Sequence, residues 1–348
     1  MDRRTWMLGI GAAVGLAGLG LYARRRAQQA RHDEAGRVIA PPPARPAGVP
    51  VAPFGAGSTA LEVTEGLDLT GRTMLVTGVT SGVGLETMRV LALRGAHVIG
   101  TGRSLARARE ACASVRGRTT PVALELTDFP SVVACAEAVL ALGVPLDALV
   151  CNAGVMALRK LEQVAGIERQ FATNHLGHFL LVHRLLAALQ AAPQGRVVVV
   201  SSGVLGWSHP AGIEWDNLSG AREYDPNRAY GQSKLANALF ALELARRFEG
   251  SAATANALHP GYVDTKLFRH YPWSLRGFHN LLPGSGKLTV AQGAATSCYV
   301  ATAPALAGVS GQFFQDCNPV VPDARARDAA AAARLWVVSE GLVAAYLG

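Results

Sequence analysis

The sequence predicts an α/β protein: a single doubly wound domain built on a parallel sheet of seven strands. From about residue 68 onward, short β-branched and apolar segments alternate with stretches long enough for crossover helices. Several of these segments, Val197–Val200 above all, are apolar without alternation, which indicates strands buried on both faces. We therefore expect a sheet covered by helices on each side, in a Rossmann-type domain over residues 68–348.

Seven segments carry the strand pattern, and most are followed by polar or glycine-rich residues. Ligands bind at the carboxyl ends of parallel strands, so the residues directly after these segments are the first candidates for a site. The predicted strands are Thr73–Thr77, His97–Thr101, Val122–Leu126, Leu146–Val150, Val197–Ser201, Ala253–Leu258 and Gln312–Phe314.

The composition indicates a globular protein in a reducing compartment. Of the 348 residues, 50% are hydrophobic, which is ample for a large core. The five cysteines are odd in number, scattered and without a C-x-x-C pair, so neither a disulfide framework nor a zinc site is indicated. The histidines show no ligand spacing, and we expect no metal.

The net charge of +8 is concentrated at the N-terminus. Residues 1–60 hold eight arginines against three acidic residues, a net charge of +5, which leaves +3 for the other 288 residues. A nucleic-acid-binding domain would carry the basic residues on its own surface. We therefore expect no nucleic acid partner.

Residues 1–32 contain an uncharged apolar segment of 17 residues, 7–23, with arginines on both sides. Its length is at the short end for a membrane span. Three interpretations are open: a single-pass anchor, a cleaved or twin-arginine export signal, and a soluble apolar helix. We expect the anchor, because no clean cleavage site precedes Arg24, and the stronger positive flank would keep the catalytic domain on the cytoplasmic side.

Residues 33–67 join this segment to the domain that begins at residue 68. Prolines recur here, with three in a row at Pro41–Pro43. Proline fixes φ and lacks a backbone donor, so such a segment favours an extended chain over a packed one. We expect a semi-rigid linker without a core of its own.

A glycine-rich turn, Thr77-Gly-Val-Thr-Ser-Gly-Val-Gly84, follows the first predicted strand. Glycine permits the tight turn and the close backbone approach that a pyrophosphate needs, and the N–H groups of the next helix face the phosphates. Such a turn often serves backbone geometry alone, but its place between a strand and a helix indicates a dinucleotide site.

The residue after the second predicted strand indicates which dinucleotide binds. An NAD enzyme carries an acidic residue about 20 positions beyond the glycines, on the ribose hydroxyls. This chain has Gly102 followed by Arg103 there. Because an arginine pairs with a 2′-phosphate, NADP(H) is expected in preference to NAD(H); the alternative is that Arg103 only caps a solvated loop beside Arg107 and Arg109.

Tyr230 and Lys234 stand four residues apart in a predicted helix. Positions i and i+4 share one helix face, so the ammonium lies beside the phenol and favours its ionised form. That moves a pKa of about 10 towards neutrality, where a phenol can act as a general acid or base. The pair alone also occurs on exposed helices, so its weight comes from the accompanying motifs.

From about residue 69 to 340 these motifs resemble the short-chain dehydrogenase/reductase superfamily, and within it the retinol-dehydrogenase-like branch that includes the WW-domain-containing oxidoreductases. The order of the motifs carries the superfamily resemblance, and their flanking residues carry the branch. Besides the glycine-rich turn, they are Asn152-Ala-Gly154, Asn174-His-Leu-Gly-His-Phe179, Ser202, Tyr230-Gly-Gln-Ser-Lys-Leu-Ala-Asn237, His259-Pro-Gly-Tyr-Val-Asp-Thr265 and Ser310-Gly-Gln-Phe-Phe-Gln-Asp-Cys317.

The resemblance implies hydride transfer between NADP(H) and a C–OH or C=O group. It implies that Tyr230 is the general acid or base, that Ser202 holds the substrate oxygen, and that Lys234 binds the nicotinamide ribose. Asn174 would hold a water of the proton relay. Ser201 competes with Ser202 for the hydroxyl role, and the alternative for Asn174 is a helix-kinking or capping amide.

The resemblance implies further cofactor contacts in the loops after the strands. At Glu125, near the adenine, the family usually has an aspartate. The implied cofactor-binding residues are Gly78, Ser81, Gly82, Val83, Gly84, Arg103, Glu125, Leu126, Asn152, Ala153, Gly154, Tyr230, Lys234, Pro260, Gly261, Val263 and Thr265.

Residues 266–290 are apolar and aromatic, as the substrate-binding segment for a lipophilic alcohol, aldehyde or ketone would be. A retinoid, a sterol and a long-chain aldehyde all fit. The alternative is a loop packed on a membrane or on a second subunit of a homo-oligomer. A nucleotide-binding regulator without turnover and a sugar-nucleotide epimerase or dehydratase are the rival functions. The intact catalytic set disfavours the regulator, and the apolar segment disfavours the sugar nucleotide.

Overall fold

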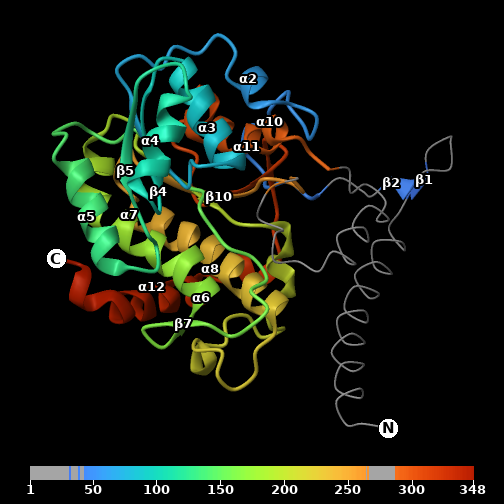
Figure 1. The fold of residues 1–348 in the computed structure, drawn as a ribbon. Helices are drawn as coiled ribbons and strands as arrows, with labels where there is room; N and C mark the ends of the chain where they lie inside the picture. Colours follow the sequence, from blue (N-terminus) through green and yellow to red (C-terminus); the bar gives the residue numbers. More distant parts are fainter. Residues whose placement is uncertain (1–30, 33–37, 40–42, 264, 266–286) are drawn as a thin grey trace, which may run out of the picture. The chain divides into compact units, whose positions relative to one another are not determined.

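The computed structural model describes residues 31–32, 38–39, 43–263, 265 and 287–348. The chain divides into two compact units, residues 1–44 with 273–286 and residues 45–272 with 287–348. In the first unit, β1 (Arg31–His32) pairs antiparallel with β2 (Val38–Ile39). The second unit holds the main sheet and every predicted site residue (Figure 1).

The main sheet has eight strands in the order β12-β11-β10-β9-β6-β3-β4-β5. All neighbouring pairs are parallel except β11 and β12. The predicted α/β class with a mostly parallel sheet is therefore confirmed. The strands are β3 (Thr73–Thr77), β4 (His97–Gly102), β5 (Thr119–Ala123), β6 (Ala148–Cys151), β9 (Arg196–Val200), β10 (Thr254–His259), β11 (Phe313–Gln315) and β12 (Asn318–Val320).

The eighth strand corrects the prediction of seven. β12 returns along β11 through Asp316 and Cys317, whose φ angles are +53° and +62°. Two positive φ angles give the two-residue hairpin turn that fits the twist of antiparallel strands. The sequence lacks the usual Asn-Gly or Asp-Gly signal for this turn. Pro319 is tolerated within the strand because β12 is the sheet edge.

At the opposite edge, β5 is displaced from its predicted position. It covers Thr119–Ala123 instead of Val122–Leu126, and it includes Pro121 opposite Gly100 of β4. Proline is again compatible with an edge strand. The shift leaves Glu125 in the turn that follows the strand.

Two layers of helices cover the sheet. In β3, Leu75 packs into a core with α5, α7, α8 and α12, whereas Met74 and Val76 pack with α3 and α11 (Figure 1). Burial on both faces explains the continuous apolar strands. The α-helices are α2 (Ala60–Val63), α3 (Gly82–Leu93), α4 (Leu105–Ala113), α5 (Phe129–Leu140), α6 (Arg169–Phe171), α7 (Gly177–Ala191), α8 (Pro226–Arg247), α10 (Val290–Gly293), α11 (Ala295–Thr302) and α12 (Ala329–Val343).

A strap, defined here as residues 45–64, belongs to the second unit, so the packed part of the chain begins before residue 68. The side-chain amide of Asn318, at the sheet edge, holds the strap through both its oxygen and its nitrogen. Asn318 Oδ1 accepts a hydrogen bond from the Ala52 N–H at 3.0 Å, and Asn318 Nδ2 donates to the Phe54 carbonyl at 2.7 Å. Backbone groups of the strap are thereby satisfied by the edge strand.

Apolar contacts hold the strap as well. The Phe54 ring lies edge-on to Tyr299 of α11, with 5.8 Å between ring centroids. The short helix α2 buries Ala60 and Val63 in the same core as α3 and α11. Much of the segment predicted as a linker is therefore packed, because a few apolar side chains outweigh its proline content.

The prediction of a single-pass membrane anchor is corrected by the structure. Among the described residues, the helices are all too short or too polar to cross a membrane. Residues 7–23, on which the prediction rested, lie outside the described residues. A catalytic domain anchored on the cytoplasmic side of a membrane is therefore not supported.

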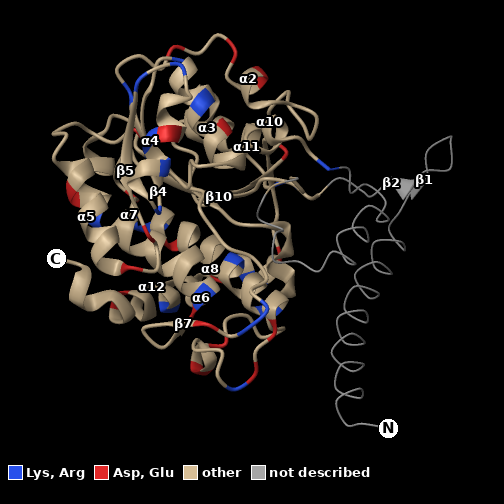
Figure 2. Cartoon of the chain, viewed as in Figure 1, with Lys and Arg blue, Asp and Glu red and all other residues tan. Residues whose placement is uncertain are grey.

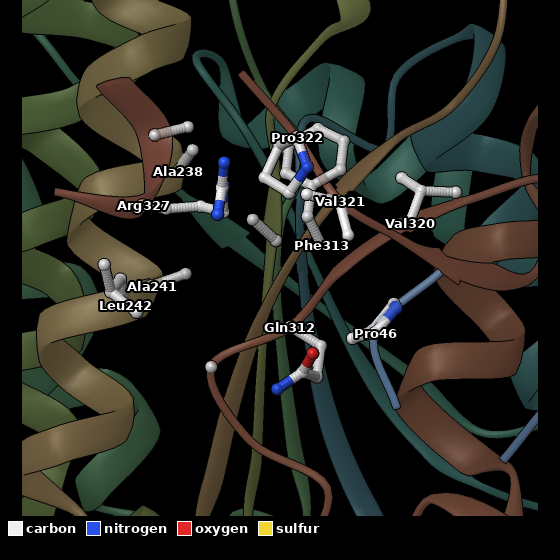
Figure 3. A pocket seen from close by; sticks show the side chains of 13 residues that line it. Pro46, Ala238, Ala241, Leu242, Gln312, Phe313, Val320, Val321, Pro322 and Arg327 are labelled. Atoms are coloured by element: carbon white, nitrogen blue, oxygen red, sulfur yellow. The ribbon is translucent and has the colours of Figure 1, made fainter. Parts of the chain in front are cut away.

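A cavity of about 80 Å³ lies between α8 and the β11–β12 edge of the sheet (Figure 3). Its lining is mostly apolar, with Leu242 of α8, Phe313 and Val320 of the edge strands, and Pro46 of the strap. None of the predicted site residues lines this cavity.

Candidate active site

The glycine-rich turn that joins β3 to α3 is tightly packed. Gly78 has a φ of +75°, and a Cβ atom there would lie 2.9 Å from the Cβ of Ala153. A Cβ atom on Gly84 would collide with the Asn152 amide and the Gly78 carbonyl. Only glycine fits these positions, and the turn consequently lies directly against the segment that follows β6.

The start of α3 has no side-chain cap. The N-cap residue, Ser81, makes no side-chain hydrogen bond to the helix. The first N–H groups of a helix have no partners within it and mark the positive end of its dipole. Thr265, from the segment after β10, lies against Gly82, with its Cγ2 3.3 Å from the position of a Cβ atom on that glycine.

Thr77, at the end of β3, connects this turn to β6. Its Oγ1 accepts hydrogen bonds from the N–H groups of Asn152 and Ala153, both at 2.9 Å. The Asn152 amide in turn donates to the Thr77 carbonyl at 2.8 Å. Asn152 and Ala153 were predicted at the cofactor, whereas Thr77 was not, because a threonine at the end of a strand carries no functional signal in the sequence.

Arg103 directly follows β4 and is exposed. Its guanidinium has no hydrogen bond or ion pair to the described part of the chain. The end of β4 adjoins the glycine-rich turn, since a Cβ atom on Gly102 would lie 2.7 Å from Thr80 Cγ2. Figure 2 shows further basic residues around α3 and α4. Arg103 thus lies at the rim of the glycine-rich turn.

Glu125 and Leu126 lie in the turn after β5. Glu125 Oε1 accepts hydrogen bonds from the Thr127 N–H at 3.1 Å and from the Thr127 hydroxyl at 2.8 Å. Leu126 is buried against Gly177, the first residue of α7. One carboxylate oxygen of Glu125 is therefore held within its own turn.

Tyr230 is carried by α8, which begins after Asp225. The Asp225 carboxylate accepts hydrogen bonds from the N–H groups of Asn227 and Arg228, at 2.9 and 2.7 Å, and so caps the helix. Tyr230 is only 4% exposed. Burial raises the pKa of its phenol, and a hydrogen bond to the Ser202 side chain acts in the opposite direction.

Lys234 lies one turn further along α8 and is equally buried. Its Nζ donates a hydrogen bond to the Val200 carbonyl at 2.9 Å and lies 5.7 Å from the centroid of the Tyr230 ring. Burial lowers the pKa of Lys234 to about 8. This ammonium was expected to lower the Tyr230 pKa, but in the structure loss of solvent raises that pKa, and the Ser202 side chain is the group that acts against the rise.

The two serines after β9 have different partners. The Ser201 hydroxyl donates to the Lys234 carbonyl at 2.6 Å, which directs it into the helix backbone. Ser202 Oγ accepts a hydrogen bond from the Val204 N–H at 3.3 Å, and its side chain lies near enough to the Tyr230 phenol to act on the pKa of that group. The structure thus brings Ser202, and not Ser201, to the tyrosine.

Asn174 lies in a single π-helical turn, Ala172–Leu176, between α6 and α7. Such turns are rare and concentrate at functional sites. Its side chain pairs with both backbone groups of Val155, at 2.8 and 2.9 Å, and donates to the Ser233 hydroxyl at 2.9 Å. With the amide engaged in this way, a water bound by Asn174 would use its main-chain carbonyl.

The segment after β10 begins at Pro260 and Gly261, where φ is +85°. Its two ends meet, because Val263 forms an isolated bridge with Leu288 and the Leu288 N–H donates to the Tyr262 carbonyl at 2.8 Å. The predicted substrate segment lies between them. Its residues 266–286 are outside the described residues.

Comparison with known proteins agrees with this geometry. A model of the short chain dehydrogenase family matches residues 72–214. The short-chain dehydrogenase TIC 32 B, chloroplastic, of Brassica napus is 41% identical over 304 residues, which cover 83% of this chain and 94% of that protein. The chain belongs to the short-chain dehydrogenase family. It is therefore a short-chain dehydrogenase/reductase enzyme.

Other relatives place the chain in the predicted branch. Human retinol dehydrogenase 14 is 38% identical over 293 residues, covering 78% of this chain and 86% of that protein. The human WW domain-containing oxidoreductase is 37% identical over 309 residues, covering 85% of this chain and 73% of that protein. The resemblance drawn from the motifs is confirmed. The chloroplastic designation of the Brassica napus protein also gives no support to the predicted membrane anchor.

Solved structures share the fold. The crystal structure of an uncharacterised protein from Mycobacterium paratuberculosis has a TM-score of 0.66 and 35% identity, covering 82% of this chain and 97% of that one. An NAD(P)-dependent gluconate 5-dehydrogenase from Beutenbergia cavernae, solved with bound NADP, has a TM-score of 0.55 and 25% identity, covering 71% and 95%. The fold is one that binds NAD(P)(H).

Proposed function

We propose that the protein is an NADP(H)-dependent oxidoreductase that interconverts a lipophilic alcohol and its aldehyde or ketone. The observation that carries this proposal is the cluster of Ser202, Tyr230 and Lys234. All three side chains are buried where β9 meets α8, and the Ser202 side chain lies near enough to the phenol to lower its pKa. A binding protein has no need of a tyrosine, a serine and a lysine in this arrangement.

The residues present fit a dinucleotide. Gly78 and Gly84 allow the turn to pack tightly against the segment after β6, and the start of α3, which has no side-chain cap, offers N–H groups to the pyrophosphate. Arg103 at the rim would pair with a 2′-phosphate, which favours NADP(H) over NAD(H). When bound, the nicotinamide supplies or accepts the hydride.

Proton transfer would belong to Tyr230. Burial keeps its phenol protonated at neutral pH, so it can donate a proton to the carbonyl oxygen during reduction and take it back during oxidation. Ser202 would hold that oxygen through a hydrogen bond. Lys234 keeps two of its ammonium hydrogens beyond the bond to Val200, and these would bind the ribose hydroxyls.

A lipophilic substrate is favoured by the surroundings of the phenol. Tyr230 packs in an apolar cluster with Met156 and Ala157, with Val204 and Trp207 against it. An apolar wall beside the proton donor suits a hydrocarbon chain or ring better than a sugar. Retinol, named in one of the relatives, is one member of this substrate class.

The proposal is tested by following NADPH oxidation with a panel of retinaldehyde, a steroid ketone, a long-chain aldehyde and a sugar nucleotide. Turnover is expected with at least one lipophilic carbonyl, and NADH is expected to be the poorer cofactor. Turnover confined to the sugar nucleotide would contradict the substrate class. Tight NADPH binding without turnover of any carbonyl or alcohol would favour the regulator.

A further inference from the structure

His178 is a buried imidazole behind the active site. It lies on α7 one turn beyond Asn174 and is 1% exposed. Its Nδ1 lies 3.0 Å from the Asn174 main-chain carbonyl oxygen, and its Nε2 lies 2.9 Å from Thr77 Oγ1. The ring therefore bridges the π-helical turn that carries Asn174 and the end of β3 that carries Thr77.

These contacts assign the proton positions on the ring. A carbonyl oxygen can only accept, so Nδ1 must carry the hydrogen and donate it to Asn174. In the neutral ring Nε2 is then a bare acceptor, and the Thr77 hydroxyl donates to it at 2.9 Å in preference to the Val150 carbonyl, which lies at 3.4 Å. Burial lowers the pKa of His178 to about 4, so the ring is neutral at physiological pH.

The direction of the Thr77 hydroxyl matters for the cofactor turn. Its hydrogen points to His178, so its lone pairs are free for the N–H groups of Asn152 and Ala153, which it accepts at 2.9 Å each. Ala153 is the residue against which Gly78 packs. A hydroxyl that turned its hydrogen towards one of those N–H groups would lose the bond it accepts from that group.

We propose that His178 is a positioning residue that joins the two halves of the site. Through Thr77 it holds the cofactor turn, and through the Asn174 carbonyl it holds the π-helical turn. This inference rests on the proposed function. His178 itself touches no reacting atom. Its effect on cofactor binding and turnover therefore passes through Thr77 and Asn174.

His175 provides a matched control within the same turn of helix. It is also fully buried, and its Nε2 lies 2.8 Å from the Ser339 hydroxyl of α12, on the side of the C-terminal helix. Replacing either imidazole removes a buried polar ring of the same size. Only His178 bonds Thr77, so the two positions separate a loss of packing from a loss of positioning.

The test uses three substitutions at His178. His178→Gln places an amide oxygen near the position of Nε2 and keeps the acceptor for Thr77. His178→Asn places an amide nitrogen near the position of Nδ1 and keeps the donor for Asn174. His178→Leu keeps neither. Each variant is made in the full chain, with His175→Leu as the control.

The NADPH dissociation constant is measured by fluorescence titration without substrate, and turnover is measured separately. For the Leu and Asn variants the dissociation constant is expected to rise about tenfold, the scale of one buried hydrogen bond, while the Gln variant stays close to wild type. For the Leu and Gln variants kcat is expected to fall, while the Asn variant keeps most of it. His175→Leu should lower the Tm but leave both constants unchanged.

If the wild-type protein binds NADPH and all three variants bind it equally well, the inference is overturned and the proposed function stays intact. Failure of the wild-type protein to bind either dinucleotide would instead overturn the proposed function.

A measurement on the unsubstituted, cofactor-free protein completes the test. Its ¹⁵N imidazole spectrum should contain a buried ring in the Nδ1–H tautomer from pH 5 to 8, assigned through its loss in His178→Leu. An Nε2–H tautomer for that ring would overturn the inference without reference to activity.

Discussion

The carboxyl ends of the central strands and the β11–β12 edge of the same sheet are built in opposite ways. At the carboxyl ends, the buried side chains are polar and ionisable, and Lys234 has its pKa displaced by burial. At the β11–β12 edge, the strap is held by apolar side chains and by the neutral amide of Asn318, whose bonds to it are both made. Arg94 and Gln292 donate further hydrogen bonds to its later residues. Burying polar and ionisable groups in the first region lowers the free energy of unfolding, and burying apolar side chains in the second raises it.

Substitutions at the carboxyl ends of the strands should therefore affect function, and substitutions at the strap should affect stability. Burying an ammonium or a phenol lowers stability, and such groups are retained where they serve catalysis. Apolar contacts at the strap stabilise the fold without touching the site. Each prediction below compares one of these regions with a matched position.

The largest effect is expected for Tyr230→Phe. The substitution removes only the transferable proton, so kcat should fall roughly 100- to 10,000-fold, the range of general acid–base catalysis. The NADPH dissociation constant should stay within a few-fold of wild type, and the Tm should not fall. Steady-state turnover, fluorescence titration and calorimetry measure the three quantities.

Tyr299→Phe is the control, because Tyr299 loses the same hydroxyl beside Phe54 of the strap. Its kcat is expected to match that of the wild type. Turnover that survives in Tyr230→Phe would remove the tyrosine from the role of proton donor.

Lys234→Met should abolish most activity and yet stabilise the cofactor-free protein. The folded pKa of about 8 lies below the ordinary value of 10.5, so the unfolded chain binds more protons between these pH values. The advantage of the methionine variant should be largest below about pH 8, roughly 1–3 kcal/mol, and should shrink as pH rises to about 10.5.

Denaturant unfolding at several pH values measures this difference. Lys160→Met, at an exposed lysine, should show neither the stabilisation nor its pH dependence. A methionine variant less stable than wild type at every pH would show that the Val200 hydrogen bond outweighs the cost of burial.

Val63→Ala tests the strap from the stability side. Val63 is 5% exposed in the core under α2, and its truncation should lower the free energy of unfolding by about 2 kcal/mol. Leu61→Ala, on the same helix but 37% exposed, should cost much less. Both variants should keep the wild-type kcat and NADPH affinity, and a selective loss of affinity in Val63→Ala would link the strap to the site.

The smallest effect is expected for Arg103→Ala, at the exposed rim of the catalytic end. Affinity for NADPH should fall about tenfold, since solvent weakens a charge-assisted bond, while affinity for NADH should hardly change. Arg109→Ala on α4 is the control and should affect neither. An equal loss for both dinucleotides would assign Arg103 a structural role.

Much of the fold could be predicted because its signals are local. Continuous apolar strands and the glycine-rich turn depend on neighbouring residues, and they located β3, β4, β6, β9 and β10 to within about two residues. The hairpin of β12 was missed because Asp316 and Cys317 adopt positive φ without glycine. The membrane anchor, inferred from composition alone, was not supported.

Within the site, local sequence patterns were enough to indicate which residue types stand at the ends of the strands: the glycine turn, the serines after β9, and the Tyr230 and Lys234 pair on one helix face. Tertiary structure alone decided how they are connected. The Ser201 hydroxyl is bonded to the Lys234 carbonyl, and Ser202 is the serine beside the phenol.

His178 shows the physical reason why the sequence alone could not predict these connections. It meets Thr77 across 101 positions of sequence, and the proton positions on its ring follow from the two acceptor and donor groups it meets there. The raised pKa of Tyr230 follows in the same way from the chain that excludes water around it. Spacing along a helix specifies which groups are neighbours, but solvent exclusion and hydrogen-bond direction depend on segments that only the packed fold brings together.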